Sequence, residues 1–478
     1  MTLYEFIVEI GNLLWGGSWN GAPLLPVPPM TAALLGTGLY LTIRLKGRTF
    51  RRLWPALLAL PKARMGSGDG EITPWRALAT ALAGQIGTGN IVGVATAISL
   101  GGPGAIFWMW ATAFVGMATA YAETVLSVRY RQKRAGGAYH GGPMYAIVGG
   151  LGAAWRPLAV LFCVGLLVGV LGGTALIQSN SLVTGLQSAA GELGWRVPAW
   201  PLGIAVAGLV FVVIIGGIKE IGAVAGRLVP FAAIAYVVTA FVILVLNAPA
   251  VPQAFQLILS SAFGLEPALG GAAGYGLAAA IRAGVARGLG SNEAGLGTVP
   301  IVHAAAQTRS PSAQGELAMV GVFIDTMIVC TMTALVILVA QGSFPDGSGG
   351  AVERAWLSPA FDGVQMTAAA FGAALPGGAY VVSAALALFA FTTLIGFAYY
   401  AEQALGFLAG AKTALPFRFI WVLLIGVGSV QAIDAVWRLG DVAFAFMAIP
   451  NLIAILLLRK KVFAEADDAD ESLKRKRK

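Results

Sequence analysis

Residues 77–100 read ALATALAGQIGTGNIVGVATAISL, an apolar stretch with a polar, glycine-rich centre. The stretch is long enough to cross a bilayer. Its centre (84–90) holds three glycines, one threonine and two carboxamides. Each glycine costs about 1 kcal/mol in a helix interior relative to alanine, and unsatisfied polar groups are costly in hydrocarbon. We therefore expect the helix to break here and to expose backbone groups to a cavity. Close packing of small residues between helices is the alternative.

The composition indicates a membrane protein that crosses the bilayer many times. Of the 478 residues, 58% are hydrophobic and 11% are charged. We expect an all-α polytopic membrane protein with about 11 transmembrane helices. The expected spans are 29–45, 77–99, 104–128, 157–187, 201–216, 228–246, 271–298, 317–340, 378–402, 417–434 and 442–459.

Lysine and arginine concentrate in alternate connections and in the C-terminal tail. Examples are the connection after the first span, with Arg48, Arg51 and Arg52, and the tail, with Lys460 and Lys461. The positive-inside rule then predicts an external N-terminus and a cytoplasmic C-terminus, in a cell inner or plasma membrane. The net charge of +9 is best explained by anchoring at anionic lipid, so no nucleic-acid partner is expected.

A second span, 271–298, also combines glycines with polar residues. The residues concerned are Arg282, Arg287, Gly288, Gly290, Ser291, Asn292, Glu293, Gly295 and Gly297. Charged residues at membrane depth usually border a polar cavity. Glu293 could instead pair with Arg287 or cap a half-helix.

The two unusual spans are five spans apart, which is an odd number. Two five-span units therefore have opposite topology, and each opens with a broken helix. This is the pattern of a secondary transporter whose site lies at the repeat interface. The predicted divisions are an N-terminal segment with the first span (1–70), a first repeat (71–247), a second repeat (248–459) and a charged tail (460–478).

Several motifs resemble the alanine/glycine:cation symporters. They are ALAGQIGTGN (81–90), GGPMY (141–145), GGIKEIG (216–222), RGLGSNEAGLG (287–297), FAFTTLIGFAYYAE (389–402) and MAIPNL (447–452). The resemblance implies a LeuT-like five-plus-five inverted-repeat fold with an extra N-terminal helix. It also implies sodium-coupled uptake of small neutral amino acids by alternating access.

A zwitterionic substrate needs one group of residues for each of its ends. The carboxylate suits the positive end of a half-helix near Gly87, Thr88 and Gly89, where glycine allows close approach. The ammonium suits carbonyls and polar side chains around 290–293. By resemblance, Gln178 lines the substrate and Phe397 limits its size. The predicted substrate residues are Gln85, Gly87, Thr88, Gly89, Gln178, Gly290, Ser291, Asn292, Glu293 and Phe397.

Sodium is the expected coupling ion, and it prefers oxygen ligands. Thr392 and Thr393 offer two hydroxyls in an apolar span, although threonine hydroxyls often bond to their own helix. By resemblance to the wider fold, the ion also takes the carbonyls of Ala83, Ile86 and Phe389. Whether Asn90 serves a second ion or caps the half-helix stays open.

Three positions depart from the pattern of the resembling family. Gln85 stands where threonine is usual, Gly290 where phenylalanine is usual and Phe397 where tryptophan is usual. One hypothesis is an enlarged pocket that takes a substrate larger than alanine. The opposite hypothesis is that Gln85 reaches into the space beside Gly290 and restores a small pocket.

Other functional residues are predicted with alternatives. Asp325 is a candidate ion or proton site or a hydrogen-bonded structural residue, and Glu123 and Glu402 are candidate gates that pair with arginine or lysine. His140 and His303 are expected at the surface. The external segment 341–377 is long for a loop and suits a lid.

The alternatives to a sodium symporter are coupling to protons, a passive channel and an enzyme. No ring of charges indicates a channel filter. The sequence contains two histidines and no nucleophile motif, so we expect no catalytic residues. The default expectation for the oligomeric state is a monomer.

Overall fold

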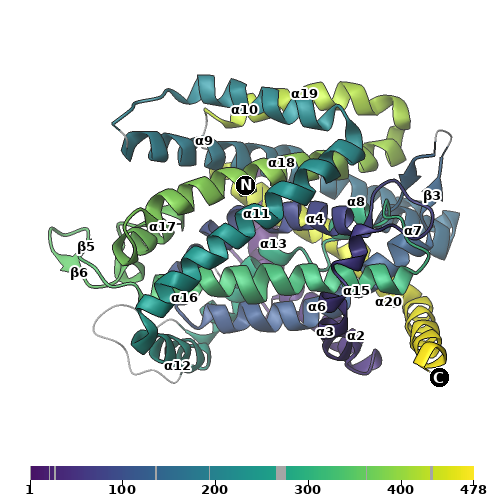
Figure 1. Ribbon diagram of the computed structural model, residues 1–478, viewed down its shortest axis with the longest axis horizontal. Helices are drawn as coiled ribbons and strands as arrows, with labels where there is room; N and C mark the ends of the chain where they lie inside the picture. The colour runs from purple at the N-terminus through teal and green to yellow at the C-terminus, as the bar shows by residue number, and fades with distance from the viewer. Residues whose placement is uncertain are drawn as a thin grey trace.

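The computed structural model describes the chain except residues 1, 21, 26–27, 135–136, 193, 265–275, 362, 431–433 and 478. The described part is a bundle of helices with three short antiparallel hairpins, β1–β2, β3–β4 and β5–β6 (Figure 1). The hairpin strands are β1 (Ser18–Trp19), β2 (Ala22–Pro23), β3 (Gln132–Lys133), β4 (Tyr139–His140), β5 (Phe344–Pro345) and β6 (Ala351–Val352).

The helices before and within the first predicted repeat follow the apolar pattern of the sequence. They are α1 (Leu3–Gly16), α2 (Pro29–Arg44), α3 (Arg48–Leu58), α4 (Pro74–Gln85), α5 (Val92–Gly101), α6 (Ala105–Arg129), α7 (Pro143–Leu151), α8 (Arg156–Gly169), α9 (Ala175–Glu192), α10 (Ala199–Ile214) and α11 (Gly217–Leu246).

The later helices continue the same pattern. They are α12 (Val251–Ala262), α13 (Leu277–Asn292), α14 (Val299–His303), α15 (Pro311–Val322), α16 (Thr331–Val339), α17 (Gly363–Ala374), α18 (Gly378–Ala409), α19 (Ala414–Gly428) and α20 (Asp434–Arg477). The short helical segments are η1 (Lys62–Arg64), η2 (Thr88–Asn90), η3 (Ala153–Trp155), η4 (Val170–Thr174), η5 (Ala248–Ala250), η6 (Phe323–Cys330), η7 (Ala355–Leu357) and η8 (Ala411–Thr413).

Within the described residues, seven helical segments are long and apolar enough to cross a membrane, and two shorter apolar helices accompany them. The chain is therefore a multi-pass membrane protein, while the count of eleven stays a prediction. Residues 271–275 and 431–433 of the predicted spans lie outside the described part. The predicted span 228–246 lies within α11, which begins earlier, at Gly217, and carries Lys219, Glu220 and Arg227 in its first turns.

The first break lies where the sequence predicted it. Helix α4 ends at Gln85, Ile86 is extended at φ −78° and ψ 91°, and α5 starts at Val92 after the 3-10 turn η2. The N–H of Gly87 donates to Asn90 Oδ1 at 2.9 Å, in place of the carbonyl of Ala83 four residues earlier. Because this amide is diverted, the Ala83 carbonyl is available to other partners.

The second break follows α13. Glu293 adopts a left-handed conformation at φ 57°, and Gly295 and Gly297 have φ values of 93° and 82° before α14 resumes the helix. Only glycine adopts such values without strain, so the two glycines are required by the backbone. The break lies at 293–298, at the C-terminal end of the predicted polar cluster, and the span continues to His303.

Two other helices are continuous but distorted. The segments η4 and η6 are π-helical turns within the α8–α9 and α15–α16 helices. Such turns widen a helix locally and often accompany functional sites. Here η6 places Asp325 beside the first break, where it accepts a hydrogen bond from Asn90.

The two ends of the bundle differ. Figure 1 shows α17 and the β5–β6 hairpin at one end, and β3 and the C-terminus at the other. We call the first end the lid side. We call the second end the basic side, because the second end carries the arginine-rich α3. The predicted lid, 341–377, contains β5–β6, η7 and α17, and Thr367 of α17 donates to the carbonyl of Ile91 at 3.1 Å.

Candidate functional site

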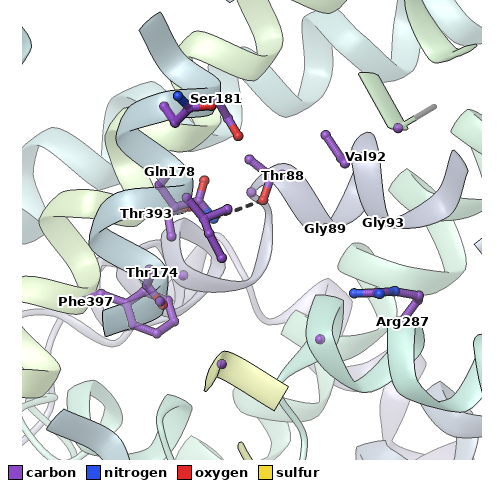
Figure 2. Close-up of a pocket in the computed structure, with 18 of the residues that line it drawn as sticks. Thr88, Gly89, Val92, Gly93, Thr174, Gln178, Ser181, Arg287, Thr393 and Phe397 are labelled. Atoms are coloured by element: carbon purple, nitrogen blue, oxygen red, sulfur yellow. Dashed lines mark hydrogen bonds between the residues drawn. The ribbon is translucent and has the colours of Figure 1, made fainter. Parts of the chain in front are cut away.

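A cavity of about 460 Å³ lies where the first and second breaks meet α9 and α18 (Figure 2). It extends from Gly84 in α4 toward Gly363 and Val364 at the start of the lid helix. Both breaks thus border one membrane-embedded cavity, as expected for irregular backbone at membrane depth.

Eight of the ten predicted substrate residues line this cavity: Gln85, Gly87, Thr88, Gly89, Gln178, Gly290, Glu293 and Phe397. Ser291 and Asn292 are not among the lining residues. Ser291 is fully buried and its hydroxyl donates to Asp325 Oδ2 at 2.9 Å. The carbonyl of Asn292 accepts a hydrogen bond from Gln85 Nε2 at 2.6 Å.

Thr88 and Gln178 join the first break to α9. Gln178 Nε2 donates to Thr88 Oγ1 at 3.1 Å, and Figure 2 shows this contact at the cavity wall. Gln178 Oε1 is buried and has no hydrogen-bond partner in the described structure. A buried acceptor without a partner is costly, so a ligand donor at this point would be stabilised.

The space beside Gly290 is empty of side chains. A Cβ added there would meet no heavy atom within 4 Å. Gln85 does not fill this space, because its Nε2 points to the Asn292 carbonyl and its Oε1 lies close to Gly321. Phe397 lies on another wall, edge-on to Tyr400 with ring centroids 5.2 Å apart.

The predicted sodium ligands converge at the end of α4. The hydroxyl of Thr393 lies 2.8 Å from the Ala83 carbonyl and 2.8 Å from the Phe389 carbonyl. Thr392 lies one residue away, with its hydroxyl 3.0 Å from the same Phe389 carbonyl. Ile86 stands at the extended end of α4. The chemistry of this oxygen-rich group suits a hard cation such as Na⁺.

Asn90 caps the first break and also contacts η6. Its Oδ1 accepts from the Gly87 N–H, and its Nδ2 donates to Asp325 Oδ1 at 2.6 Å. Asp325 also accepts hydrogen bonds from Ser291 and Thr326. The Asp325 carboxylate therefore ties together the two broken helices and η6.

Two other buried acids lie at the second break. Glu293 accepts a hydrogen bond from Thr298 Oγ1 at 2.7 Å, and no described ion pair joins it to Arg287. The prediction that Glu123 pairs with an arginine or lysine was wrong. Glu123 accepts from Asn451 Nδ2 at 2.7 Å and from the Gly295 N–H at 3.5 Å, so it fixes the broken backbone.

Glu402 does pair with an arginine, as predicted: Arg418 Nη2 lies 2.9 Å from Glu402 Oε2. The expectation for His303 was wrong. His303 is fully buried in α14, with its Nδ1 2.6 Å from Gln314 Nε2. The half-helix after the second break is enclosed by α6 and α15, and the sequence pattern alone did not reveal this.

Several lining residues of α8–α9 were missed by the sequence analysis. They are Gly169, Gly173, Thr174, Ile177, Ser181 and Thr184. Small and polar residues recur there at spacings of three to four, which marks one face of a helix. This spacing in an otherwise apolar span could have identified the face.

On the basic side of the bundle, one arginine bridges the two broken helices. The guanidinium of Arg131 donates to the carbonyls of Asp69, Ala304, Ala306 and Thr308 at 2.7–3.0 Å. These carbonyls belong to the chain segments just before the first broken helix and just after the second. Arg131 therefore holds the two broken helices together on this side.

Further ion pairs and hydrogen bonds lie on the same side of the bundle. Arg48 is 2% exposed and pairs with Glu316 at 2.9 Å and with Asp470 of α20. Glu71 accepts the Tyr139 N–H at 2.8 Å, and its burial raises the pKa of the Glu71 carboxyl.

Comparisons with known proteins agree with this arrangement. A family model described as the sodium:alanine symporter family matches residues 19–478. The chain belongs to this family.

The relatives in this family include proteins named for different amino acids. The sodium/alanine symporter AgcS of Methanococcus maripaludis is 39% identical over 482 residues, covering 100% of each chain. A Bacillus subtilis protein named "Probable sodium/glutamine symporter GlnT" is 36% identical, covering 98% of this chain and 91% of its own.

Among solved structures, MhsT in complex with L-phenylalanine has a TM-score of 0.55 at 15% identity. The match covers 84% of this chain and 93% of MhsT. At this identity the similarity shows the fold alone, which is the LeuT-like fold that the family resemblance implied. Family and fold together make the chain a transporter and not an enzyme.

Proposed function

We propose that this chain couples the inward movement of sodium to the uptake of neutral amino acids, and that its site admits side chains longer than that of alanine. The observation that carries the proposal is the cavity shared by two broken helices, beside the oxygen group of Ala83, Phe389 and Thr393. A zwitterion and a cation would there bind next to each other.

The substrate carboxylate would lie at the N-terminal end of η2 and α5. The first N–H groups of a helix lack partners within the helix and carry the positive end of its dipole. Thr88 and Gly89 line this part of the cavity. A Cβ added at Gly89 would lie 3.2 Å from Ser291 Cα, so glycine keeps the two breaks in close contact.

The substrate ammonium would lie across the cavity. Glu293 lines the cavity with a carboxylate that the described structure does not pair with a base. The unpartnered Oε1 of Gln178 offers a second acceptor. An ammonium group has three donors, and each of these acceptors is suited to one of them.

The open space at Gly290 supports a substrate larger than alanine. The enlarged-pocket hypothesis requires that no other side chain fills the space, and the contacts of Gln85 with Asn292 and Gly321 agree with it. The Bacillus subtilis relative GlnT is named as a probable sodium/glutamine symporter, and glutamine is a neutral amino acid that is larger than alanine.

The distribution of lysine and arginine supports an orientation with the N-terminus and the lid side outside and the C-terminus in the cytoplasm. The cavity borders the lid residues Gly363 and Val364, and Arg131 bridges the two broken helices on the opposite side. This combination supports an outward-facing state of an alternating-access cycle. Coupled closure of the lid and opening at Arg131 would complete the cycle.

Uptake by the purified chain in liposomes tests the proposal. We expect accumulation of labelled alanine and glutamine with an inward sodium gradient, and none with an inward proton gradient alone. Accumulation that is driven by protons and independent of sodium would mean that the coupling ion is H⁺ and not Na⁺. Equal rates with and without any gradient, and no accumulation, would indicate a passive pore.

A further inference from the structure

Arg287 is a basic residue in the wall of the cavity, and the roles assigned above leave it unused. It lies in α13, one turn before Gly290, and Figure 2 shows its side chain extending from the helix toward the cavity. The structure records no hydrogen bond or ion pair between Arg287 and any residue that it describes. An arginine at membrane depth without a protein partner is costly, so it marks a position where a ligand supplies the acceptor.

The neighbouring residues determine which part of a ligand can reach the guanidinium. Gly290 is about 4.5 Å from Arg287 along the helix axis, at 1.5 Å per residue. No neighbouring atom lies within 4 Å of a Cβ placed on Gly290, and Gly290 and Arg287 line the same cavity. The carboxylate and ammonium of an amino acid already have partners at Gly89 and Glu293 in the proposed function.

The length of the side chain then selects the substrate. Alanine ends one bond beyond its Cα, whereas the amide carbon of glutamine lies three bonds beyond it, each about 1.5 Å. Only the longer side chain spans the empty volume beside Gly290. A guanidinium has five donors and no acceptor, so the group that it binds must carry an oxygen acceptor.

We propose that Arg287 binds the side-chain oxygen of the substrate and gives this transporter a preference for amino acids that end in a carboxamide. The inference rests on the proposed function and names the substrate class of the same site. Among the neutral amino acids of the proposed function, those that end in a carboxamide supply this oxygen acceptor.

The test compares glutamine with methionine, which has a similar length and no oxygen acceptor. In sodium-driven uptake into liposomes, we expect the kcat/KM of glutamine to exceed that of methionine at least tenfold, the typical effect of one charge-assisted hydrogen bond. Arg287→Met should bring this ratio to about one. Arg287→Lys should retain part of the preference, because it keeps the charge without the planar donors.

A matched control lies on the same helix. Arg282 donates to the carbonyl of Gly16 and is not among the cavity residues, so Arg282→Met should keep the glutamine preference. Elution of each variant as a single folded species on size exclusion excludes misfolding as the cause.

The outcomes separate this inference from the proposed function. Sodium-driven uptake by the wild type with no preference for glutamine over methionine, or with glutamate preferred to glutamine, overturns the inference alone. An equal fall of the glutamine and methionine rates in Arg287→Met also overturns it, since that result indicates a role in gating. Absence of sodium-driven uptake of every amino acid in the wild type overturns the proposed function itself.

Discussion

Replacing Thr393 with valine should weaken sodium binding strongly while leaving the shape of the site unchanged. Valine has almost the same volume as threonine but no hydroxyl. In the structure, that hydroxyl lies 2.8 Å from both the Ala83 and the Phe389 carbonyls. The Ala83 carbonyl lacks the Gly87 N–H, which donates to Asn90 instead. Under the proposed assignment, the substitution removes one ion ligand and loosens the orientation of two others.

The size of the effect follows from the energy of a single charge-assisted contact. Losing one contact with a charged partner costs about 1.5–3 kcal/mol. This corresponds to roughly a tenfold to hundredfold rise in the sodium concentration for half-maximal uptake. The assay is uptake of labelled alanine into liposomes across a series of external sodium concentrations, at constant ionic strength.

Thr393→Ser is the matched control, because serine keeps the hydroxyl and should shift the sodium dependence by less than threefold. Equal half-saturation by sodium in the wild type and in a folded Thr393→Val would refute the assignment of this oxygen group to the coupling ion. A loss of maximal rate at an unchanged sodium half-saturation would likewise place Thr393 outside the ion site.

Three further substitutions test other parts of the site. Gly290→Phe should fill the open volume and reduce the kcat/KM of glutamine at least tenfold more than that of alanine, as measured by competition; equal effects on both would contradict the enlarged pocket. Gln85→Leu should lower the free energy of unfolding by about 1–3 kcal/mol, because the Asn292 carbonyl loses its donor; thermal unfolding in detergent measures this, and an unchanged stability would argue against the bond. Arg131→Lys should loosen the contact between the two broken helices on the basic side, since one ammonium cannot replace a guanidinium that donates to four carbonyls; thiol labelling of the cavity variant Thr174→Cys from that side should rise severalfold, and unchanged labelling would mean that Arg131 does not limit access to the cavity from this side.

The positions of the breaks could be predicted from local sequence because their cause is local. Glycines and carboxamides at 84–90 are unfavourable in a membrane helix wherever the rest of the chain lies. The same reasoning identified the Glu293 region, although the break begins at Glu293 itself. Because these two features are five spans apart, they also predicted two repeats of opposite topology.

The direction of individual side chains could not be predicted from local sequence. Gln85 bonds to the Asn292 carbonyl, 207 residues away in the sequence, and this contact decides between the two pocket hypotheses. The burial of His303 depends on its neighbours in space, including Gln314. The π-helical turn at 323–330 has no signal in composition, yet it determines where Asp325 lies.

The most direct test of sodium-coupled symport is movement of sodium driven by the amino acid. Liposomes with equal sodium inside and outside receive an inward gradient of alanine or glutamine, and uptake of labelled sodium is followed. Because coupling between two ligands is reciprocal, the account predicts transient accumulation of sodium that requires the amino acid and is lost in Thr393→Val. Amino-acid entry without any sodium uptake would contradict it.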